Sequence, residues 1–98
     1  MSKTLFERIV SREIQADIVF ENEALLAFRD INPQAPVHVL IVPKRVVARI
    51  DEAQRSDREL LGDLLLAAAQ VARQLGLAEN GYRLVINNGK DGGETVPH

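Results

Sequence analysis

The sequence of 98 residues contains no cysteine, and it has neither a basic excess nor a long hydrophobic run. The absence of cysteine excludes disulfide bonds, thiol catalysis and cysteine-ligated zinc or iron–sulfur sites. Twelve basic residues against fourteen acidic ones give a net charge of -2, whereas nucleic-acid-binding domains are typically basic. The longest apolar run, residues 64–69, is far shorter than the roughly twenty residues that span a bilayer. We therefore expect a soluble cytoplasmic protein with no nucleic-acid or membrane partner.

The composition that remains is that of a folded domain. Hydrophobic residues make up 46% of the sequence and charged residues 27%, both near the average of globular proteins, which excludes disorder. At this length a single domain with one core, residues 1–98, is the expectation.

Local patterns in the first third predict a short helix and a hairpin. Thr4 and Glu7 match a capping box, and the apolar residues that follow at helical spacing predict a helix over 5–11. The apolar runs 18–20 and 24–28 are separated by three polar residues, which predicts two strands joined by a tight turn.

The middle of the sequence predicts a buried strand and a long helix. Residues 37–42 are apolar at every position except His38, which is typical of a central strand covered on both faces. Ser56 and Glu59 match a second capping box, and the apolar stripe that follows predicts a helix over 57–75. The stripe is wider than one core needs, so we expect the helix to meet a second subunit.

The last quarter predicts a strand and a glycine-rich loop. Gly76 stands where a C-terminal helix cap belongs, residues 82–87 alternate as a strand does, and glycines are frequent over 88–93. The resulting order is helix, hairpin, strand, long helix, strand, loop. It predicts an α+β fold in which an antiparallel sheet carries one short N-terminal helix and one long helix.

Asp30, at the end of a predicted strand, is the first candidate for a functional residue. A carboxylate there can accept two hydrogen bonds from a vicinal diol such as that of ribose. The residue alone favours another interpretation, in which Asp30 caps the turn into Asn32-Pro33.

The glycine-rich loop and the two histidines are also ambiguous by themselves. Loop amides can approach a phosphate, with Asn87 or Thr95 as further donors, but a plain loop is the commoner case. The P-loop ending of Gly-Lys-Ser/Thr is missing. A lone His38 on an apolar strand face is more often a core residue, and a terminal His98 is often mobile. Sixty residues separate the two histidines, so no metal site and no cofactor are predicted.

Taken together, these segments resemble a known family. The stretch DINPQAPVHVLIVPK over 30–44, a long helix, and NNGKDGGETVPH over 87–98 resemble the histidine triad (HIT) family. Within it the chain is similar to the HINT-type purine nucleoside phosphoramidases. The resemblance covers residues 5–98 with segment order and spacing preserved.

The sequence departs from the family pattern at two places. The family is defined by a His-x-His-x-His run, and His98 matches its first histidine, whereas the second is the family's nucleophile. We therefore expect a chain that ends at His98 to lack the catalytic strand, to be poorly stable and to be inactive. Glu94 stands where relatives commonly carry glutamine, and its negative charge beside a phosphate site is expected to weaken anion binding.

The resemblance implies where a purine nucleoside would bind. The family's apolar purine pocket is matched by Phe6, Ile9, Phe28 and Ile31. Asp30 matches the acidic residue that holds the ribose hydroxyls, so the resemblance favours the diol acceptor over the turn cap.

The resemblance also implies the phosphate end of the site. Asn87, Gly93 and Thr95 match residues near the α-phosphate. His38 and His98 match histidines that flank and orient the nucleophile. No metal or cofactor is required by the family reaction, in which an imidazole attacks the α-phosphorus, an amine or other group leaves, and water releases the nucleoside monophosphate.

The resemblance implies a homodimeric hydrolase of purine nucleoside phosphoramidates or related nucleotidyl substrates, with its interface on the long helix and residues 82–86. One alternative is a dinucleoside polyphosphate hydrolase on the same fold. The other is a non-catalytic nucleotide-binding or interaction module, which a chain ending at His98 would favour.

Overall fold

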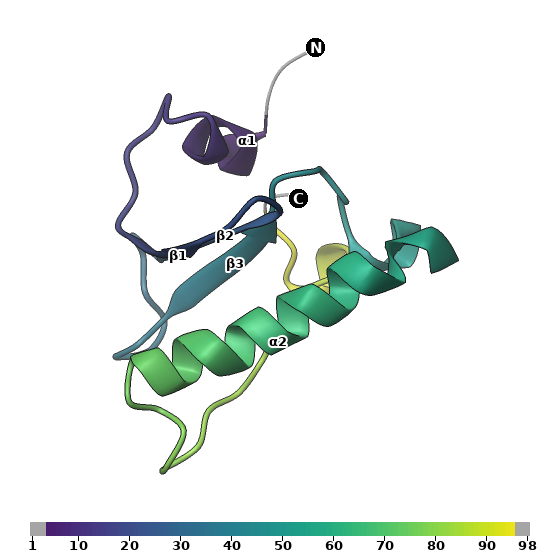
Figure 1. The fold of residues 1–98 in the computed structure, drawn as a ribbon. Helices are drawn as coiled ribbons and strands as arrows, with labels where there is room; N and C mark the ends of the chain where they lie inside the picture. The colour runs from purple at the N-terminus through teal and green to yellow at the C-terminus, as the bar shows by residue number, and fades with distance from the viewer. Residues whose placement is uncertain (1–3, 96–98) are drawn as a thin grey trace.

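The computed structural model describes residues 4–95 as an antiparallel sheet with two helices. The elements are α1 (Leu5–Val10), β1 (Ile18–Glu21), β2 (Leu25–Arg29), β3 (Val39–Pro43) and α2 (Arg58–Gln74). Three short 3-10 turns complete them: η1 (Ile50–Glu52), η2 (Arg55–Asp57) and η3 (Lys90–Gly92). The strands follow the order β1-β2-β3, and Figure 1 shows α1 and α2 on opposite sides of the sheet. The predicted α+β fold is thereby confirmed.

The capping box predicted for α1 is present. The Glu7 amide donates to Thr4 Oγ1 at 3.0 Å, and the Thr4 amide donates to Glu7 Oε1 at 2.9 Å. Two N–H groups that the first turn leaves without helical partners are thereby satisfied. The helix ends at Val10, one residue earlier than predicted, and it buries Ile9 against the sheet.

Within the described residues, β2 is the central strand and β3 an edge. Residues 25–28 of β2 are all buried, because β1 and β3 flank the strand and a helix lies on either side of the sheet. β3 pairs with β2 from Val39 to Pro43 and is fully buried only at its last two residues. Within residues 4–95 the strand predicted over 37–42 therefore lies at an edge and not at the predicted central position, because an apolar run reports covered faces and not neighbouring strands.

Side chains from the two helices cover opposite faces of the sheet. Ile9 of α1 packs with Leu26, Phe28 and Val42, which the strand pleat places on one face. The residues of α2 that are buried are small or β-branched: Ala67, Ala68, Val71 and Ala72. Alanine at three of these positions lets the helix backbone lie close to its neighbours.

The ends of α2 show one prediction confirmed and one wrong. Gly76, at φ 75°, follows the helix, and its amide donates to the Arg73 carbonyl at 3.1 Å, so the predicted C-terminal cap is confirmed. At the other end Ser56 does not cap the helix; the Asp57 carboxylate instead accepts the Gln54 amide at 2.8 Å. No helix within residues 4–95 combines the length and apolar character needed to cross a membrane.

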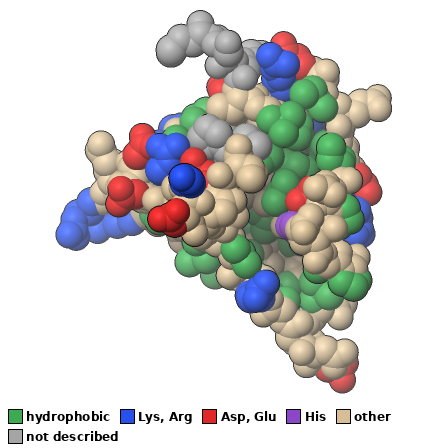
Figure 2. All heavy atoms as spheres, turned by 180° about the vertical axis from the view of Figure 1, so that it is seen from behind, with side chains coloured by type: hydrophobic (Ala, Val, Ile, Leu, Met, Phe, Trp, Pro, Cys, Tyr) green, Lys and Arg blue, Asp and Glu red, His purple; other side chains and the backbone are tan. Residues whose placement is uncertain are grey.

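The strand predicted over 82–87 is not formed. This segment turns back and passes behind α2 toward the stretch that precedes the helix (Figure 1), without regular secondary structure. Its apolar side chains remain exposed: Tyr82, Leu84, Val85 and Ile86. Figure 2, which shows the face turned away in Figure 1, displays hydrophobic side chains gathered in a broad area. Alternation assigns faces to side chains, but a strand also needs a hydrogen-bonded neighbour, which residues 4–95 do not supply to this segment.

Candidate functional site

The connection from β2 to β3 brings Asp30 and His38 together. The Asp30 amide donates to the His38 carbonyl at 2.9 Å, which extends the β2–β3 pairing by one step. Asp30 Oδ1 accepts the Asn32 amide at 2.9 Å, so the carboxylate does cap the turn. Its Oδ2 lies 3.4 Å from His38 Nε2. Turn capping therefore uses one carboxylate oxygen and leaves the second directed at the imidazole.

His38 holds the same loop through its other ring nitrogen. The Gln34 amide donates to His38 Nδ1 at 2.9 Å, so a neutral imidazole here carries its proton on Nε2, the nitrogen that lies 3.4 Å from Asp30 Oδ2. The side chain is partly exposed and is not part of the buried core. It lies beside the Asp30 carboxylate.

A groove of about 640 Å³ lies between α1, the segment that follows it, and the end of β2. Its lining residues are Ile9, Arg12, Ile14, Gln15, Ala16, Asp17, Ile18 and Ile31. The groove thus joins two of the residues predicted for the purine pocket, Ile9 and Ile31, and Ile31 is 91% exposed. The other two, Phe6 and Phe28, pack on each other with ring centroids 6.0 Å apart, and Phe28 is buried beside Ile9.

Sequence reasoning missed most of this groove. Residues 12–17 form an irregular connection whose apolar members, Ile14 and Ala16, also pack against the core. Ile14, Ala16 and Ile18 alternate with polar residues as a strand does, but the paired strand β1 begins only at Ile18, so the alternation over 14–17 does not mark a regular element. The polar rim from Arg12, Gln15 and Asp17 likewise has no signature of its own.

The glycine-rich loop closes on itself at the opposite end of the candidate site. Asn87 Nδ2 donates to the Gly93 carbonyl at 3.4 Å, so two of the predicted phosphate-site residues are neighbours. Gly89 and Gly93 have φ of 74° and 82°, where other residues are strained. The Gly89 amide donates to Glu94 Oε1 at 2.9 Å, so this loop amide is already bound to an anion. Thr95 is exposed beyond the turn.

Glu94 is paired with Arg49, a residue that sequence analysis did not single out. Arg49 Nε lies 3.0 Å from Glu94 Oε1, and Arg49 Nη2 lies 2.9 Å from Glu94 Oε2. The Arg49 guanidinium, followed by the Gly89 amide, lowers the pKa of Glu94 from its ordinary 4.5 to about 2. The negative charge expected to disturb a phosphate site therefore has a partner cation.

The two ends of the site are not connected directly. Within residues 4–95 no hydrogen bond or ion pair joins Asp30 or His38 to the loop 87–95. His98, the predicted second orienting histidine, lies outside the described residues. In the part of the chain that the structure describes, no three side chains of the metal-ligating kinds gather in one place.

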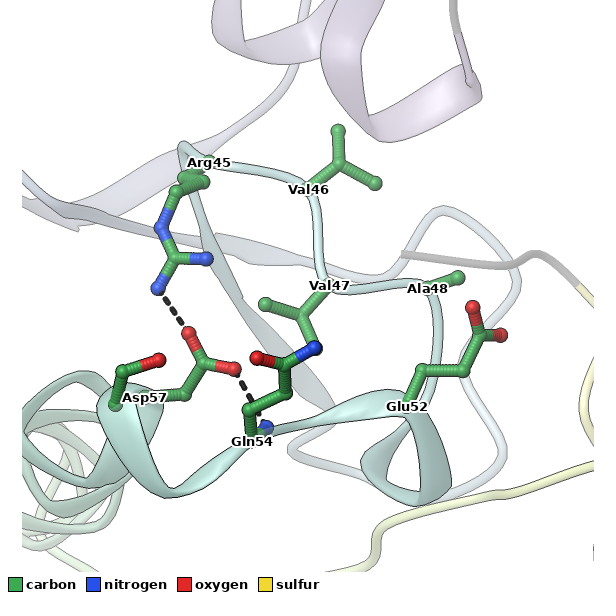
Figure 3. Close-up of a pocket in the computed structure, with 8 residues that line it drawn as sticks. Arg45, Val46, Val47, Ala48, Glu52, Gln54 and Asp57 are labelled. Carbon is green, nitrogen blue, oxygen red and sulfur yellow. Dashed lines mark hydrogen bonds and ion pairs between the residues drawn. The ribbon is translucent and has the colours of Figure 1, made fainter.

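A second cavity, of about 300 Å³, lies in the connection from β3 to α2 (Figure 3) and contains none of the predicted site residues. Asp57 holds its wall together: the carboxylate accepts Arg45 Nη2 at 2.5 Å and the Gln54 amide at 2.8 Å. The Gln54 amide and, next, the Arg45 guanidinium lower the pKa of Asp57. These contacts fix the segment that carries Arg49.

Comparison with known proteins places this geometry in a family. Residues 11–98 match the HIT domain. The chain is 54% identical over 95 residues to an uncharacterized HIT-like protein of Synechococcus elongatus, covering 97% of this chain and 82% of that protein. It is 42% identical over 96 residues to the purine nucleoside phosphoramidase of Escherichia coli, covering 98% and 81%.

The backbone is also similar to a solved structure of the same family. The HIT family hydrolase of Legionella pneumophila superposes with a TM-score of 0.95 at 48% identity, covering 98% of this chain and 86% of that one. Both the sequence match and the backbone match extend over nearly the whole chain. The chain belongs to the HIT family.

Proposed function

We propose that this protein is a HIT-type hydrolase that binds a purine nucleotide and releases a nucleoside monophosphate from a phosphoramidate or a related nucleotidyl substrate. The observation that carries the proposal is the Asp30 carboxylate, whose Oδ2 faces His38 Nε2 at 3.4 Å beside the groove that Ile31 lines. The name of the Escherichia coli relative, a purine nucleoside phosphoramidase, supports the same substrate class.

In this proposal the groove takes the purine and Asp30 takes the ribose. Ile9 and Ile31 supply apolar surface for the flat base, and burying such surface favours binding. The Asp30 carboxylate accepts hydrogen bonds from the 2′- and 3′-hydroxyls, which carry the only neighbouring pair of donors on the sugar. His38 keeps this carboxylate oriented when the site is empty.

The phosphate end lies toward Asn87, Gly93 and Thr95. The attacking imidazole belongs, by the family pattern, to the second histidine of the run that His98 begins, and His38 and His98 orient it. Attack forms a nitrogen–phosphorus bond to the imidazole and breaks the phosphorus–nitrogen bond to the amine, which leaves with a proton. Water then adds across the new bond, frees the imidazole and releases the nucleoside monophosphate.

The proposal is tested by binding and by turnover. We expect adenosine 5′-monophosphate to bind more tightly than its 2′-deoxy form. The Asp30→Ala substitution should erase this preference, at a loss of about 1.5–3 kcal/mol for a hydrogen bond to a charged group. Asp30→Asn is the matched variant, because its amide oxygen still caps the Asn32 turn while the charge is removed. Equal affinity for ribose and deoxyribose forms in the unmodified protein would contradict the role of Asp30.

Turnover distinguishes the alternatives. In protein that carries the rest of the His-x-His-x-His run, hydrolysis of adenosine 5′-phosphoramidate should exceed that of diadenosine polyphosphates at equal concentrations. The reverse order would favour a dinucleoside polyphosphate hydrolase. Nucleotide binding without turnover of either substrate would favour a non-catalytic binding module.

A further inference from the structure

The glycine-rich loop is anchored to a segment that lies far from it in sequence. Arg49 and Glu94 are 45 positions apart, yet two N–H groups of the guanidinium meet the two carboxylate oxygens at 3.0 and 2.9 Å. A second contact runs beside it, from the Asp51 amide to Asn88 Oδ1 at 2.8 Å. Paired hydrogen bonds of this kind fix orientation as well as distance.

The Glu94 side chain binds the loop backbone as well as Arg49. It is 13% exposed, and the oxygen that accepts Arg49 Nε also accepts the Gly89 amide at 2.9 Å. One carboxylate therefore joins Arg49 to the first residue of the glycine turn. The remaining closure of the loop consists of short turn hydrogen bonds and the 3.4 Å contact from Asn87 to Gly93.

The segment that presents Arg49 is itself fixed. Asp57 binds Arg45 and the Gln54 amide (Figure 3), which ties both ends of the stretch between β3 and α2. Arg49 also pairs with Glu52 on the same stretch. The Arg49 guanidinium is thus held by Glu52 on its own segment and binds Glu94 of the glycine-rich loop.

We propose that Arg49 is a positioning residue for the phosphate end of the site: through Glu94 it fixes the loop that carries Asn87, Gly93 and Thr95, and it neutralises the carboxylate beside the bound phosphate. The assignment of a phosphate to this loop rests on the proposed function. The anchoring of the loop by Arg49 does not, so the two are tested separately.

The anchor is tested by proteolysis without nucleotide. The lysines are Lys3, Lys44 and Lys90, and a lysine-specific protease reports the exposed Lys90 in the loop against the partly buried Lys44, which pairs with Glu21. We expect Arg49→Ala to speed cleavage after Lys90 roughly tenfold relative to Lys44, because local opening follows the loss of a charge-assisted hydrogen-bond pair. Arg55→Ala, which removes an exposed arginine of η2, is the control. Unchanged cleavage at Lys90 in Arg49→Ala overturns the proposal.

Charge neutralisation is tested by comparing adenosine 5′-monophosphate with adenosine. Arg49→Ala should weaken the nucleotide about tenfold and leave the nucleoside unchanged, because only the phosphate meets the unpaired carboxylate. Adding Glu94→Gln should restore part of the nucleotide affinity, since the amide oxygen still accepts the Gly89 hydrogen bond without a charge. Equal weakening of both ligands, or no recovery in the double variant, overturns this role. If the unmodified protein binds neither ligand, the proposed function fails, and the Lys90 result alone decides the anchor.

Discussion

At the scale of single residues, the Glu94 carboxylate shows how its surroundings set a protonation state. It accepts two hydrogen bonds from Arg49 and one from the Gly89 amide, and these contacts lower its pKa to about 2. In the unfolded chain the contacts are absent and the pKa returns to its ordinary 4.5. Between these two values the unfolded chain binds more protons than the folded one at this position.

The first prediction concerns acid unfolding. The contribution of Glu94 to folding stability is complete above its unfolded pKa of 4.5 and is lost as the pH falls toward about 2. In Glu94→Gln the fall in the free energy of unfolding over this window should be shallower, measured by urea unfolding at several pH values. Some slope will remain, because Lys44 and then Arg12 lower the pKa of Glu21 in the same direction.

Glu79→Gln, at an exposed position after α2, is the matched control and should leave the acid slope as it is in the unmodified protein. Parallel slopes for Glu94→Gln and the unmodified protein would show that the Arg49 pair does not persist in solution.

Residue roles could be predicted where the signal is local, whereas the roles that the family pattern implies stay predictions. For Asp30 the sequence offers a turn cap or, by the resemblance, a diol acceptor; the structure shows the cap on one oxygen, and the other lies 3.4 Å from His38 Nε2. The partner of Glu94 could not be predicted. Several arginines of the sequence could pair with this glutamate, and only the folded chain brings Arg49 within reach.

At the scale of elements, predictions succeed where neighbouring residues form the structure and fail where it depends on residues far away in the sequence. The α1 cap depends on two side chains three residues apart, so its pattern can be read directly. The Ser56 pattern is equally local, but the neighbouring Asp57 carboxylate takes the Gln54 amide and a turn of η2 precedes the helix. The strand over 82–87 fails because pairing depends on a neighbour outside its own sequence.

The second prediction compares the Thr4 cap, which forms, with the Ser56 cap, which does not. Thr4→Ala should destabilise the protein by about 1 kcal/mol, the usual effect of removing an N-terminal cap, measured by thermal or urea unfolding. Because α1 carries Ile9 into the groove, fraying should also weaken nucleotide binding modestly.

Ser56→Ala is the matched control, since no hydrogen bond of its hydroxyl is found within residues 4–95. Its effect on unfolding should be close to zero. A loss equal to that of Thr4→Ala would mean that Ser56 does cap α2 in solution.

At the scale of the whole molecule, the described chain leaves apolar side chains uncovered on α2 and on the segment that passes behind it. Leu66 is 70% exposed and Leu65 52%, and the apolar residues of 82–86 are exposed as well. Figure 1 shows this segment running behind α2. Monomeric proteins rarely leave a large contiguous apolar patch in water.

The last prediction is therefore a homodimer in which α2 and residues 82–86 meet their counterparts. Sedimentation at micromolar concentration should show twice the mass of one chain. Leu66→Glu should raise the dissociation constant roughly 100-fold or more, because a twofold interface buries the unpaired carboxylate twice. Leu5→Glu is the control, since Leu5 is exposed on α1, on the opposite side of the sheet, and its variant should stay dimeric. A single-chain mass for the unmodified protein would contradict the dimer, and an intact dimer in Leu66→Glu would place the interface away from this face of α2.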